Sequence, residues 1–422
     1  MLKRLVRSLP FLTLCLLTAC QDSGVEATQS EERVYAGENS PEHVDTPYVL
    51  LISIDGYRRD YNALYAPPNL TRFAEEGIQA TSLIPAYPSD TFPNHYSIVT
   101  GMFPGKHGIV ANNFFDASRD ADYRLGNAAT ITDGTWYGGT PLWSAVENAG
   151  MVAASYFWLG SEAEIAGTRP SYAEVYNSSV PHSERISTVL EWLAYPDQYR
   201  PHFITLYFSS VDTAGHGWGP ESDQVRDAVL AIDEDLGTLF AGLDELDIPV
   251  NVFVVSDHGM IAPDPNRIIN IDAFGDLSGM RGVNLGSKLF LYADDADRAD
   301  EAFAELRANE ENYRAFRAGD TPDAWHADNP RFGDIIVAAD APYTLLRANT
   351  DRELQGGTHG YDPYLFPDVR GVFFARGPDL VANTSIPSFS NVHIYPLIMN
   401  LLGLESPEDI DGRPEVLAEI LN

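Results

Sequence analysis

Positive charge is scarce in this chain. The 422 residues include 27 lysines and arginines against 61 acidic residues, which gives a formal net charge of −34. Only Lys3, Lys106 and Lys288 are lysines. Sequence-independent binding of nucleic acid needs clustered cations that displace counterions from phosphates, so stable nucleic-acid binding is excluded. A small anionic substrate would need a local cation, and a bound metal is a better candidate than a basic patch. Solubility alone would also account for the acidity.

Cysteine is nearly absent. The two cysteines, Cys15 and Cys20, lie in an N-terminal segment in which three basic residues precede an apolar run over residues 9–17. This run is too short to span a bilayer as a mature helix, so it predicts a signal peptide over residues 1–19. Because Cys15 would be removed with it, the mature chain has no pair of cysteines for an internal disulfide.

The end of the signal segment, Leu17-Thr18-Ala19-Cys20, resembles the lipobox of bacterial lipoproteins. The resemblance implies that Cys20 becomes a lipidated N-terminus. Gln21 after it implies delivery to the outer membrane of a Gram-negative cell. We therefore expect an exported lipoprotein that faces the periplasm or the cell surface and contacts the membrane only through its lipid. A plain signal peptide with an incidental cysteine is the alternative.

Large apolar side chains are also few in residues 20–46, where Ser, Glu, Gln, Gly and Pro predominate. Such a composition buries too little apolar surface to offset the conformational entropy lost on ordering, so it predicts a flexible tether. From residue 47 to 422, short β-branched or aromatic runs alternate with helical patterns. This alternation predicts one α/β domain with a mostly parallel central sheet and helices on both faces. Stretches rich in Gly, Asn, Asp and Pro at 110–140 and 260–285 predict smaller insertions.

The expected elements follow from hydrophobic periodicity and helix end signals. The strands are Tyr48–Ile54, Met151–Trp158, His202–Ser209, Pro249–Ser256, Lys288–Ala293 and Gly371–Arg376. The helices are Asn69–Glu76, Thr140–Ala149, Ser183–Ala194, Asp223–Leu246 and Ala299–Asn309.

Three of the expected strands lead into side chains that suit a metal. Asp55 follows the first strand. Asp212 and His216 follow the third, and Asp257 and His258 follow the fourth. Ligands of open α/β sheets gather beyond the carboxyl ends of strands, and zinc prefers carboxylates with neutral imidazoles. A single Asp after a strand is more often a helix cap or a turn residue, but three such places together favour a metal site.

Two further residues are candidates on weaker grounds. His359 lies in a glycine-flanked loop, where the backbone can approach an ion closely, although exposed loop histidines share this pattern. Pro93 predicts the first position of a helix, which would place Thr91 at the helix N-terminus, where amide groups favour a phosphate. Otherwise Thr91 is a simple helix cap, because a hydroxyl is a poor nucleophile until a base or metal lowers its pKa.

Several motifs occur together in one order along the chain. They are Asp55-Gly56-Tyr57-Arg58, Thr91-Phe92-Pro93-Asn94-His95-Tyr96, Thr100-Gly101 with Pro104 and His107-Gly108, Pro141-Leu142-Trp143, Phe157-Trp158-Leu159-Gly160-Ser161-Glu162, Asp212 with His216, Ser256-Asp257-His258-Gly259-Met260 and His359-Gly360-Tyr361. The set resembles the nucleotide pyrophosphatase/phosphodiesterase family of the alkaline phosphatase superfamily over residues 46–402. The resemblance implies an alkaline-phosphatase-like fold.

The resemblance also implies a site with two zinc ions. One ion would be held by Asp55, Thr91, Asp257 and His258, and the other by Asp212, His216 and His359. Thr91 would attack phosphorus and form a covalent phospho-threonine, while the two ions stabilise the entering and leaving oxygens.

Three more polar residues fall within the motifs or beside them. Asn112 corresponds to the family position whose amide donates to a phosphate oxygen, although Asn112 beside Asn113 is also a turn pattern. His95 and His107 correspond to no ligand of the family, so we interpret them as structural.

The resemblance implies a nucleotide substrate. Phe92, Tyr176 and Tyr207 correspond to positions that line the base pocket of the family's nucleotide-cleaving members, where aromatic faces stack on a base. In a chain rich in Tyr, such residues are otherwise core. No cationic pair for a terminal phosphate dianion is found, which favours a diester or pyrophosphate bond and release of a nucleoside 5′-monophosphate. The alternatives are a choline-headgroup or lysophospholipid phosphodiesterase with the same zinc core, and a non-catalytic metal-binding lipoprotein. The sequence does not indicate the oligomeric state.

Overall fold

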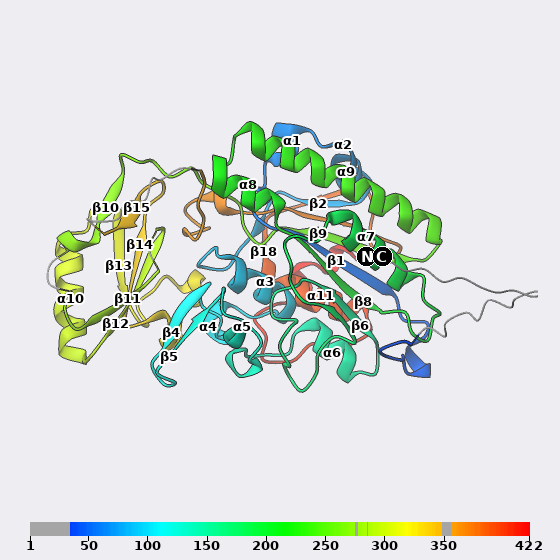
Figure 1. Ribbon diagram of the computed structural model, residues 1–422, viewed down its shortest axis with the longest axis horizontal. Helices are drawn as coiled ribbons and strands as arrows, with labels where there is room; N and C mark the ends of the chain where they lie inside the picture. The colour runs from blue at the N-terminus through cyan, green and yellow to red at the C-terminus, as the bar shows by residue number, and fades with distance from the viewer. Residues whose placement is uncertain (1–33, 275–276, 285, 348–355) are drawn as a thin grey trace, which may run out of the picture. The chain divides into compact units, whose positions relative to one another are not determined.

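The computed structural model describes residues 34–274, 277–284, 286–347 and 356–422 (Figure 1). The signal segment, Cys20 and most of the expected tether lie outside the described residues and stay predictions. The folded unit begins at residue 36, before the expected boundary at 47. Asn39 is buried there, and its side-chain amide donates to the carbonyl oxygens of Asp197 and Arg200.

The central sheet has eight strands. From edge to edge they are β17 (Thr384–Ile386), β2 (Ile78–Ala80), β16 (Phe373–Arg376), β9 (Val250–Val255), β1 (Tyr48–Ile54), β8 (Phe203–Phe208), β6 (Ala153–Tyr156) and β7 (Tyr172–Glu174). All neighbours are parallel except β16, which runs antiparallel to β9 and β2. The middle strands β9, β1 and β8 are buried at every residue, as their apolar sequences predict. The expected mostly parallel sheet is confirmed.

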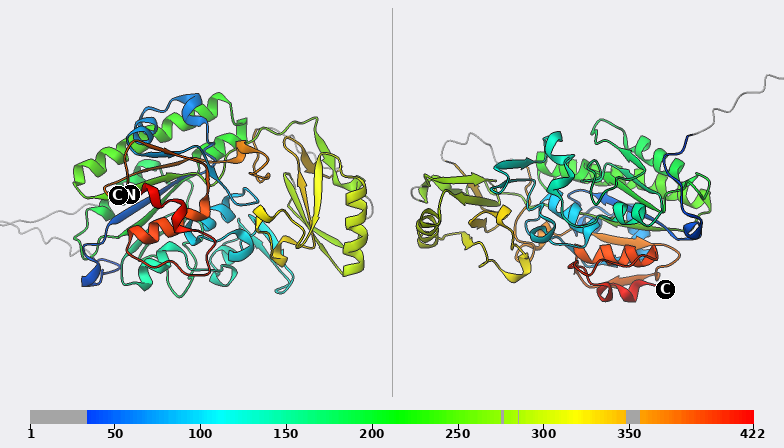
Figure 2. Two further views of the ribbon diagram at one scale, coloured as in Figure 1. Left: turned by 180° about the vertical axis from the view of Figure 1, so that it is seen from behind. Right: turned by 90° about the horizontal axis from the view of Figure 1, so that it is seen from below.

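Helices cover both faces of this sheet (Figures 1 and 2). One face carries α1 (Tyr61–Tyr65), α2 (Pro68–Glu76), α7 (His182–Leu193), α8 (Ser210–Trp218) and α9 (Asp223–Leu246). The other carries α3 (Thr91–Thr100), α6 (Leu142–Asn148) and α11 (Ile394–Leu401). The bounds of α9 and β1 are those that the sequence predicts. At the start of α9 the hydroxyl of Ser222 caps the helix by accepting from the amide of Val225.

The strand Lys288–Ala293 is β12, and its expected place in the central sheet is wrong. It belongs to a second, antiparallel sheet in the order β11 (Met280–Val283), β12, β14 (Ile335–Ala339) and β13 (Tyr313–Arg317), packed against α10 (Ala296–Ala308) (Figure 1). Periodicity identifies a strand but not its partners, which are set by tertiary packing. The strands β10 (Ile268–Asn270) and β15 (Thr344–Leu346) pair beside this sheet, so the insertion expected at 260–285 reaches to about residue 346.

Short elements complete the fold. Residues 110–140 contain the hairpin of β4 (Asn113–Asp116) and β5 (Ala121–Arg124), followed by α5 (Ala128–Ile131). The remaining strands of the described residues are β3 (Leu83–Ile84) and β18 (Phe389–Ser390), which pair with each other, and the remaining α-helix is α4 (Pro104–His107). In the part of the chain that the structure describes, we find no helix with the length and apolar character needed to cross a membrane.

The start of α3 differs from the expectation for Pro93. The helix begins at Thr91, with Asp90 as its N-cap, so Pro93 is the third helical residue and not the first. Proline is tolerated there because the amides of the whole first turn have no intrahelical partner. Thr91 therefore stands one residue inside the helix and is not its cap.

Candidate active site

The carboxyl ends of three neighbouring strands bring most of the candidate ligands together. β9, β1 and β8 lie side by side and run parallel. Asp55 follows β1, while Asp257 and His258 follow β9. Helix α8, which begins soon after β8, carries Asp212 and His216. Its first turn is fixed to the end of β1, because the amide of Asp212 donates to the carbonyl oxygen of Asp55 at 3.1 Å.

Gly56 permits the close approach of β1 and α8. It has a φ of +69°, in the left-handed region, and a Cβ there would lie 2.8 Å from Cα and Cβ of Asp212. Its amide donates to Asp257 Oδ1 at 3.2 Å. Only glycine therefore allows the turn after β1 to approach both Asp212 and Asp257.

His258 is the centre of a first cluster. Its Nε2 lies 3.4 Å from Asp55 Oδ1, 3.1 Å from Asp257 Oδ2 and 3.2 Å from Thr91 Oγ1. All four side chains are buried. Donor atoms bound tetrahedrally to zinc at about 2.0–2.2 Å lie about 3.3–3.6 Å from one another. The distances around His258 thus suit one shared ion.

Asp212, His216 and His359 form a second cluster. Asp212 Oδ1 lies 3.4 Å from His216 Nε2 and 3.9 Å from His359 Nε2, and the two Nε2 atoms are 3.1 Å apart. The rings of His359 and His258 stack with centroids 3.6 Å apart. The ligand atoms of Asp212, His258 and His359 also lie within 4.8 Å of one another. The two clusters are therefore contiguous.

The hydrogen bonds of His216, His258 and His359 define where their lone pairs point. In each ring Nδ1 lies 2.8–2.9 Å from a backbone carbonyl oxygen, to which it can only donate. In a neutral imidazole the other nitrogen, Nε2, then carries the lone pair. Each Nε2 thus faces carboxylate oxygens or another Nε2. These contacts are repulsive unless a cation lies between the atoms.

The carboxylates show the same pattern. Asp55 Oδ2 accepts from the Tyr207 hydroxyl at 2.6 Å, and Asp257 Oδ1 accepts from an amide. In contrast, Asp55 Oδ1, Asp257 Oδ2 and Asp212 Oδ1 are buried without a hydrogen-bond partner, and these are the atoms that approach the histidines. Buried polar atoms nearly always have a partner. The residues of each cluster therefore fit a divalent cation.

The protonation of the metal-free site follows from burial. Burial raises the pKa of Asp55 well above its usual range, and the charges of Asp257 and Asp212 raise it further. Burial, together with the charge of Asp212, likewise raises the pKa of Asp257. Burial lowers the pKa of His258 and of His359, so both rings are neutral. Protons on the two carboxyls are thus the competitors of a metal ion.

We expect the stabilisation by zinc to grow as the pH rises from about 5 to about 8. A carboxyl whose pKa is raised by folding stabilises the folded state below its unfolded pKa, and this stability is lost as the pH rises through the folded pKa. The metal-free protein therefore loses stability from Asp55 and Asp257 as the pH rises, while a bound cation removes that cost. The measurement is the difference in melting temperature between zinc-loaded and chelated protein. A difference that is constant or falls over this range would contradict the assignment.

Thr91 and Asn112 lie beside the first cluster. Thr91 is only 9% exposed. The amide oxygen of Asn112 accepts from the backbone amide of Phe92 at 2.8 Å. This bond orients the Asn112 side chain, so its NH₂ group remains a donor with no partner among the described residues. A hydroxyl oxygen and an amide donor thus stand next to each other at the start of α3.

A cavity of about 430 Å³ opens from these residues. Asp55, Thr91 and Asp212 form its polar end. The remaining lining is largely apolar and aromatic. It comprises Phe92; Leu125, Gly126 and Ile131; Phe157, Trp158, Leu159, Gly160 and Glu162; Tyr176; and Tyr207, Ser209 and Thr213. An apolar cavity with a few convergent polar groups is the usual form of a small-molecule site.

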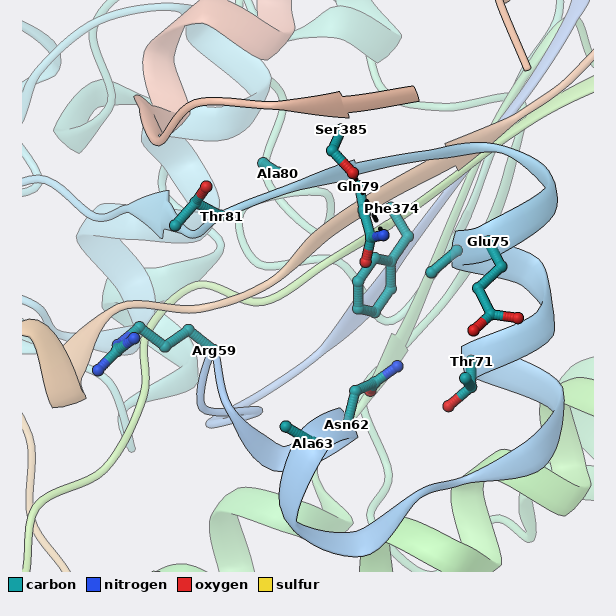
Figure 3. Close-up of a pocket in the computed structure, with 11 residues that line it drawn as sticks. Arg59, Asn62, Ala63, Thr71, Glu75, Gln79, Ala80, Thr81, Phe374 and Ser385 are labelled. Carbon is teal, nitrogen blue, oxygen red and sulfur yellow. Dashed lines mark hydrogen bonds between the residues drawn. The ribbon is translucent and has the colours of Figure 1, made fainter. Parts of the chain in front are cut away.

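A second cavity, of about 450 Å³, shares no lining residue with the first (Figure 3). It lies among α1, α2, β2, β16 and β17. The Arg59 guanidinium extends away from its centre and donates to the carbonyl oxygen of Pro367. No histidine and no member of either cluster lines it. Ligand geometry, and not volume, therefore distinguishes the candidate active site.

The family model of type I phosphodiesterase/nucleotide pyrophosphatase matches residues 49–362. The chain belongs to this family. All seven candidate ligands of the two clusters lie within the matched residues. The resemblance that the ordered motifs suggest is thereby confirmed.

Two proteins of the phosphodiesterase family are similar to this chain in sequence. Venom phosphodiesterase from Naja atra is 33% identical over 380 residues, which cover 86% of this chain and 45% of the venom protein. Ectonucleotide pyrophosphatase/phosphodiesterase family member 3 from Bos taurus is 32% identical over 382 residues, which cover 86% and 43%. The chain thus spans less than half the length of these relatives.

A solved structure of murine ectonucleotide pyrophosphatase/phosphodiesterase 5 is also similar, with a TM-score of 0.84 and 27% identity. The match covers 89% of this chain and 100% of that one. The murine protein is an inactive variant, with alanine in place of a threonine, in complex with AMP. The alkaline-phosphatase-like fold of the phosphodiesterase family is therefore shown for this chain.

The three expected base-pocket residues of this phosphodiesterase fold differ in how exposed their side chains are. Phe92, Tyr176 and Tyr207 all line the cavity. Phe92 and Tyr207 are buried, whereas Tyr176 is 45% exposed at the rim. Tyr207 also binds Asp55 through its hydroxyl, so it orients a candidate ligand as well as forming a wall.

His95 lies closer to the site than the sequence suggests. It is fully buried in α3, and its Nδ1 lies 2.9 Å from the carbonyl oxygen of Thr91 and 3.3 Å from Asp257 Oδ2. Its Nε2 lies 2.8 Å from the hydroxyl of Ser53. The spacing of four residues from Thr91 places both on one helix face, which is the signal that could have indicated this position. His107, in contrast, binds Ser97 and contacts neither cluster.

Proposed function

We propose that this member of the phosphodiesterase family is a zinc-dependent enzyme that hydrolyses nucleotide phosphodiester or pyrophosphate bonds. One observation carries the proposal. Two contiguous carboxylate–imidazole clusters point unpartnered lone pairs at each other, and a buried threonine hydroxyl lies 3.2 Å from the central histidine, at the polar end of an aromatic cavity.

Zinc suits the donor set of both clusters. Asp55, Asp257 and His258 with Thr91, and Asp212, His216 and His359, offer imidazole nitrogen and carboxylate oxygen with no thiolate. This combination suits a catalytic zinc site that keeps a position open for substrate. When bound, two zinc ions would lower the pKa of the threonine hydroxyl and of water and would stabilise the leaving oxygen.

Thr91 is the proposed nucleophile. Its Oγ1 attacks phosphorus, the bond from phosphorus to the leaving oxygen breaks, and a phospho-threonine forms that water then hydrolyses. The free NH₂ group of Asn112 donates to a non-bridging phosphate oxygen, where charge shifts during the transfer. The backbone amide of Thr91 can add to this stabilisation: Phe92 already donates to Asn112 and Pro93 has no N–H, so it is the amide of the first turn of α3 that is left without an intrahelical partner.

A nucleotide suits the cavity next to this chemistry. Aromatic walls accept any base by stacking, and the cavity is closed at its inner end by the buried Phe92 and open at the rim beside Tyr176. The similar murine structure holds AMP. We therefore propose a nucleoside 5′-monophosphate as the product.

We expect turnover of p-nitrophenyl thymidine 5′-monophosphate, with a higher KM in Tyr176→Ala. Loss of one stacking partner costs about 1–3 kcal/mol, which is roughly a 5- to 150-fold rise in KM. Val175→Ala is the matched control, since Val175 is 65% exposed and does not line the cavity. Cleavage of glycerophosphocholine without turnover of the thymidine ester would instead identify a headgroup phosphodiesterase. Zinc binding without any hydrolysis would identify a non-catalytic protein.

A further inference from the structure

Two lysines lie in the described residues, and their surroundings differ. Lys106 is 39% exposed and pairs with Asp411 at 3.1 Å. Lys288 is 7% exposed, and its Nζ lies 2.7 Å from Oδ1 of Asp90, which is 6% exposed. Lysine is rarely buried without a partner of opposite charge. Lys288 and Asp90 therefore form a buried ion pair directly before the candidate nucleophile.

Asp90 is an unusual N-cap. An Asp at this position normally accepts from the first amides of its own helix. The Asp90 side chain makes no such bond in α3. Its Oδ1 accepts from Lys288 instead, and its Oδ2 accepts from the backbone amide of Asn112 at 3.4 Å. One carboxylate thus joins the residue before Thr91 to the backbone of Asn112.

The residues next to Asp90 join the same point to the second cluster. The carbonyl oxygen of Ser89 accepts from His359 Nδ1 at 2.8 Å. The Ser89 hydroxyl donates to the carbonyl oxygen of Tyr361 and accepts from the amide of Gly360, both at 2.9 Å. Asp90 Oδ1 itself lies 3.9 Å from His359 Nδ1. The loop of His359 is therefore tied to the segment that leads into Thr91.

Gly360 shows how tightly this loop packs on the ion pair. Its φ is +93°, and a Cβ there would lie 2.7 Å from both Asp90 Oδ1 and Lys288 Nζ. A side chain at this position would separate the pair or displace the loop. Contact between the ion pair and the His359 loop therefore depends on glycine.

The Lys288–Asp90 pair also balances the charge of a buried carboxylate beside the second cluster. Asp90 is a buried carboxylate 3.9 Å from His359 of the second cluster, and a buried charge without a counter-ion is strongly unfavourable. Lys288 supplies that counter-ion from β12 of the small antiparallel sheet. The sheet that the sequence did not distinguish thus contributes a residue to the surroundings of the site.

We propose that Lys288 and Asp90 are positioning residues, which hold Thr91, Asn112 and His359 in the arrangement that the reaction needs. The inference rests on the proposed function. Neither side chain lines the substrate cavity, so both act through the residues they fix.

The test is Lys288→Met in the zinc-loaded full chain. This change keeps an unbranched apolar side chain as long as the lysine stem up to Cε, and it leaves Asp90 without a counter-ion. We expect kcat to fall about 10- to 100-fold, while KM stays within about twofold. We also expect zinc to be released to a chelator about 10- to 100-fold faster, which is the effect of losing a residue that orients a metal ligand. The double variant Asp90→Asn/Lys288→Met, which has no buried charge, should recover part of both losses.

Lys106→Met is the matched control, since it removes a partly exposed lysine–aspartate pair and should leave kcat and zinc release unchanged. If Lys288→Met does not fold, Asp90→Asn is measured by the same readouts. The inference would be overturned if these variants had the kcat and the zinc release of the wild type. It would also be overturned if the loss of activity disappeared once activity was expressed per folded protein. If the wild type hydrolyses no nucleotide ester, the proposed function fails, and zinc release still decides the inference.

Discussion

Thr91→Ala is expected to lower turnover of p-nitrophenyl thymidine 5′-monophosphate by roughly 10⁴-fold or more, because no oxygen remains to form the phospho-threonine. Zinc content should change little, since Asp55, Asp257 and His258 remain as ligands for the proposed first ion. The measurements are steady-state kinetics and metal analysis on the same preparation. Thr91→Ser, which keeps a hydroxyl, should retain far more activity.

Thr100→Ala is the matched control for this change. Thr100 is the last residue of the same helix, is fully buried, and donates to the carbonyl oxygen of Tyr96 at 2.7 Å. Its loss should reduce the free energy of unfolding by about 1 kcal/mol and leave turnover unchanged. Full activity of Thr91→Ala would show that the covalent mechanism is wrong. A variant that loses zinc together with activity would assign Thr91 a role in metal retention only.

His258→Ala is expected to remove at least one of the two proposed zinc ions and to lower turnover by about 10³-fold or more. His258 Nε2 is the atom around which Asp55, Asp257 and Thr91 are arranged, and its ring stacks on His359. Without it, two buried carboxylates face each other with one ligand fewer for a compensating cation. Metal content per chain and kcat are measured together.

His202→Ala is the control for losing a buried histidine. His202 is buried before the first residue of β8, at the opposite end of the strand from Asp212, and its ring stacks on Tyr48. The variant should lose stability but keep its zinc and its turnover. Retention of both zinc ions in His258→Ala would contradict the assignment of the first cluster.

The fold could be predicted where local pattern determines structure. The bounds of β1 and α9 follow from a continuous apolar run and from a Ser222 cap before an amphipathic helix. The small sheet could not be predicted, because the apolar pattern of β12 is the same whether its neighbours are parallel or antiparallel. Its partners β11, β13 and β14 are selected by packing around α10.

The candidate site could likewise be predicted only in part. Residue types and their order along the chain indicated the seven candidate ligands, among them Thr91, and also Asn112. The family match covers all of them. They could not indicate that His95 lies 3.3 Å from Asp257, that Tyr207 binds Asp55, or that Asp90 is paired with Lys288. These contacts join residues from about 150 to about 200 positions apart in the chain.

The sequence by itself determined the chemistry that is available. It has carboxylates and imidazoles after apolar strands, a threonine near a helix start, and almost no lysine to bind an anion. Only the tertiary structure decided which lone pairs face each other and which charges are compensated. The physical reason is that side-chain type is local, whereas repulsion between Asp55, Asp257 and His258, and its relief by a cation, exist only when strands distant in sequence lie side by side.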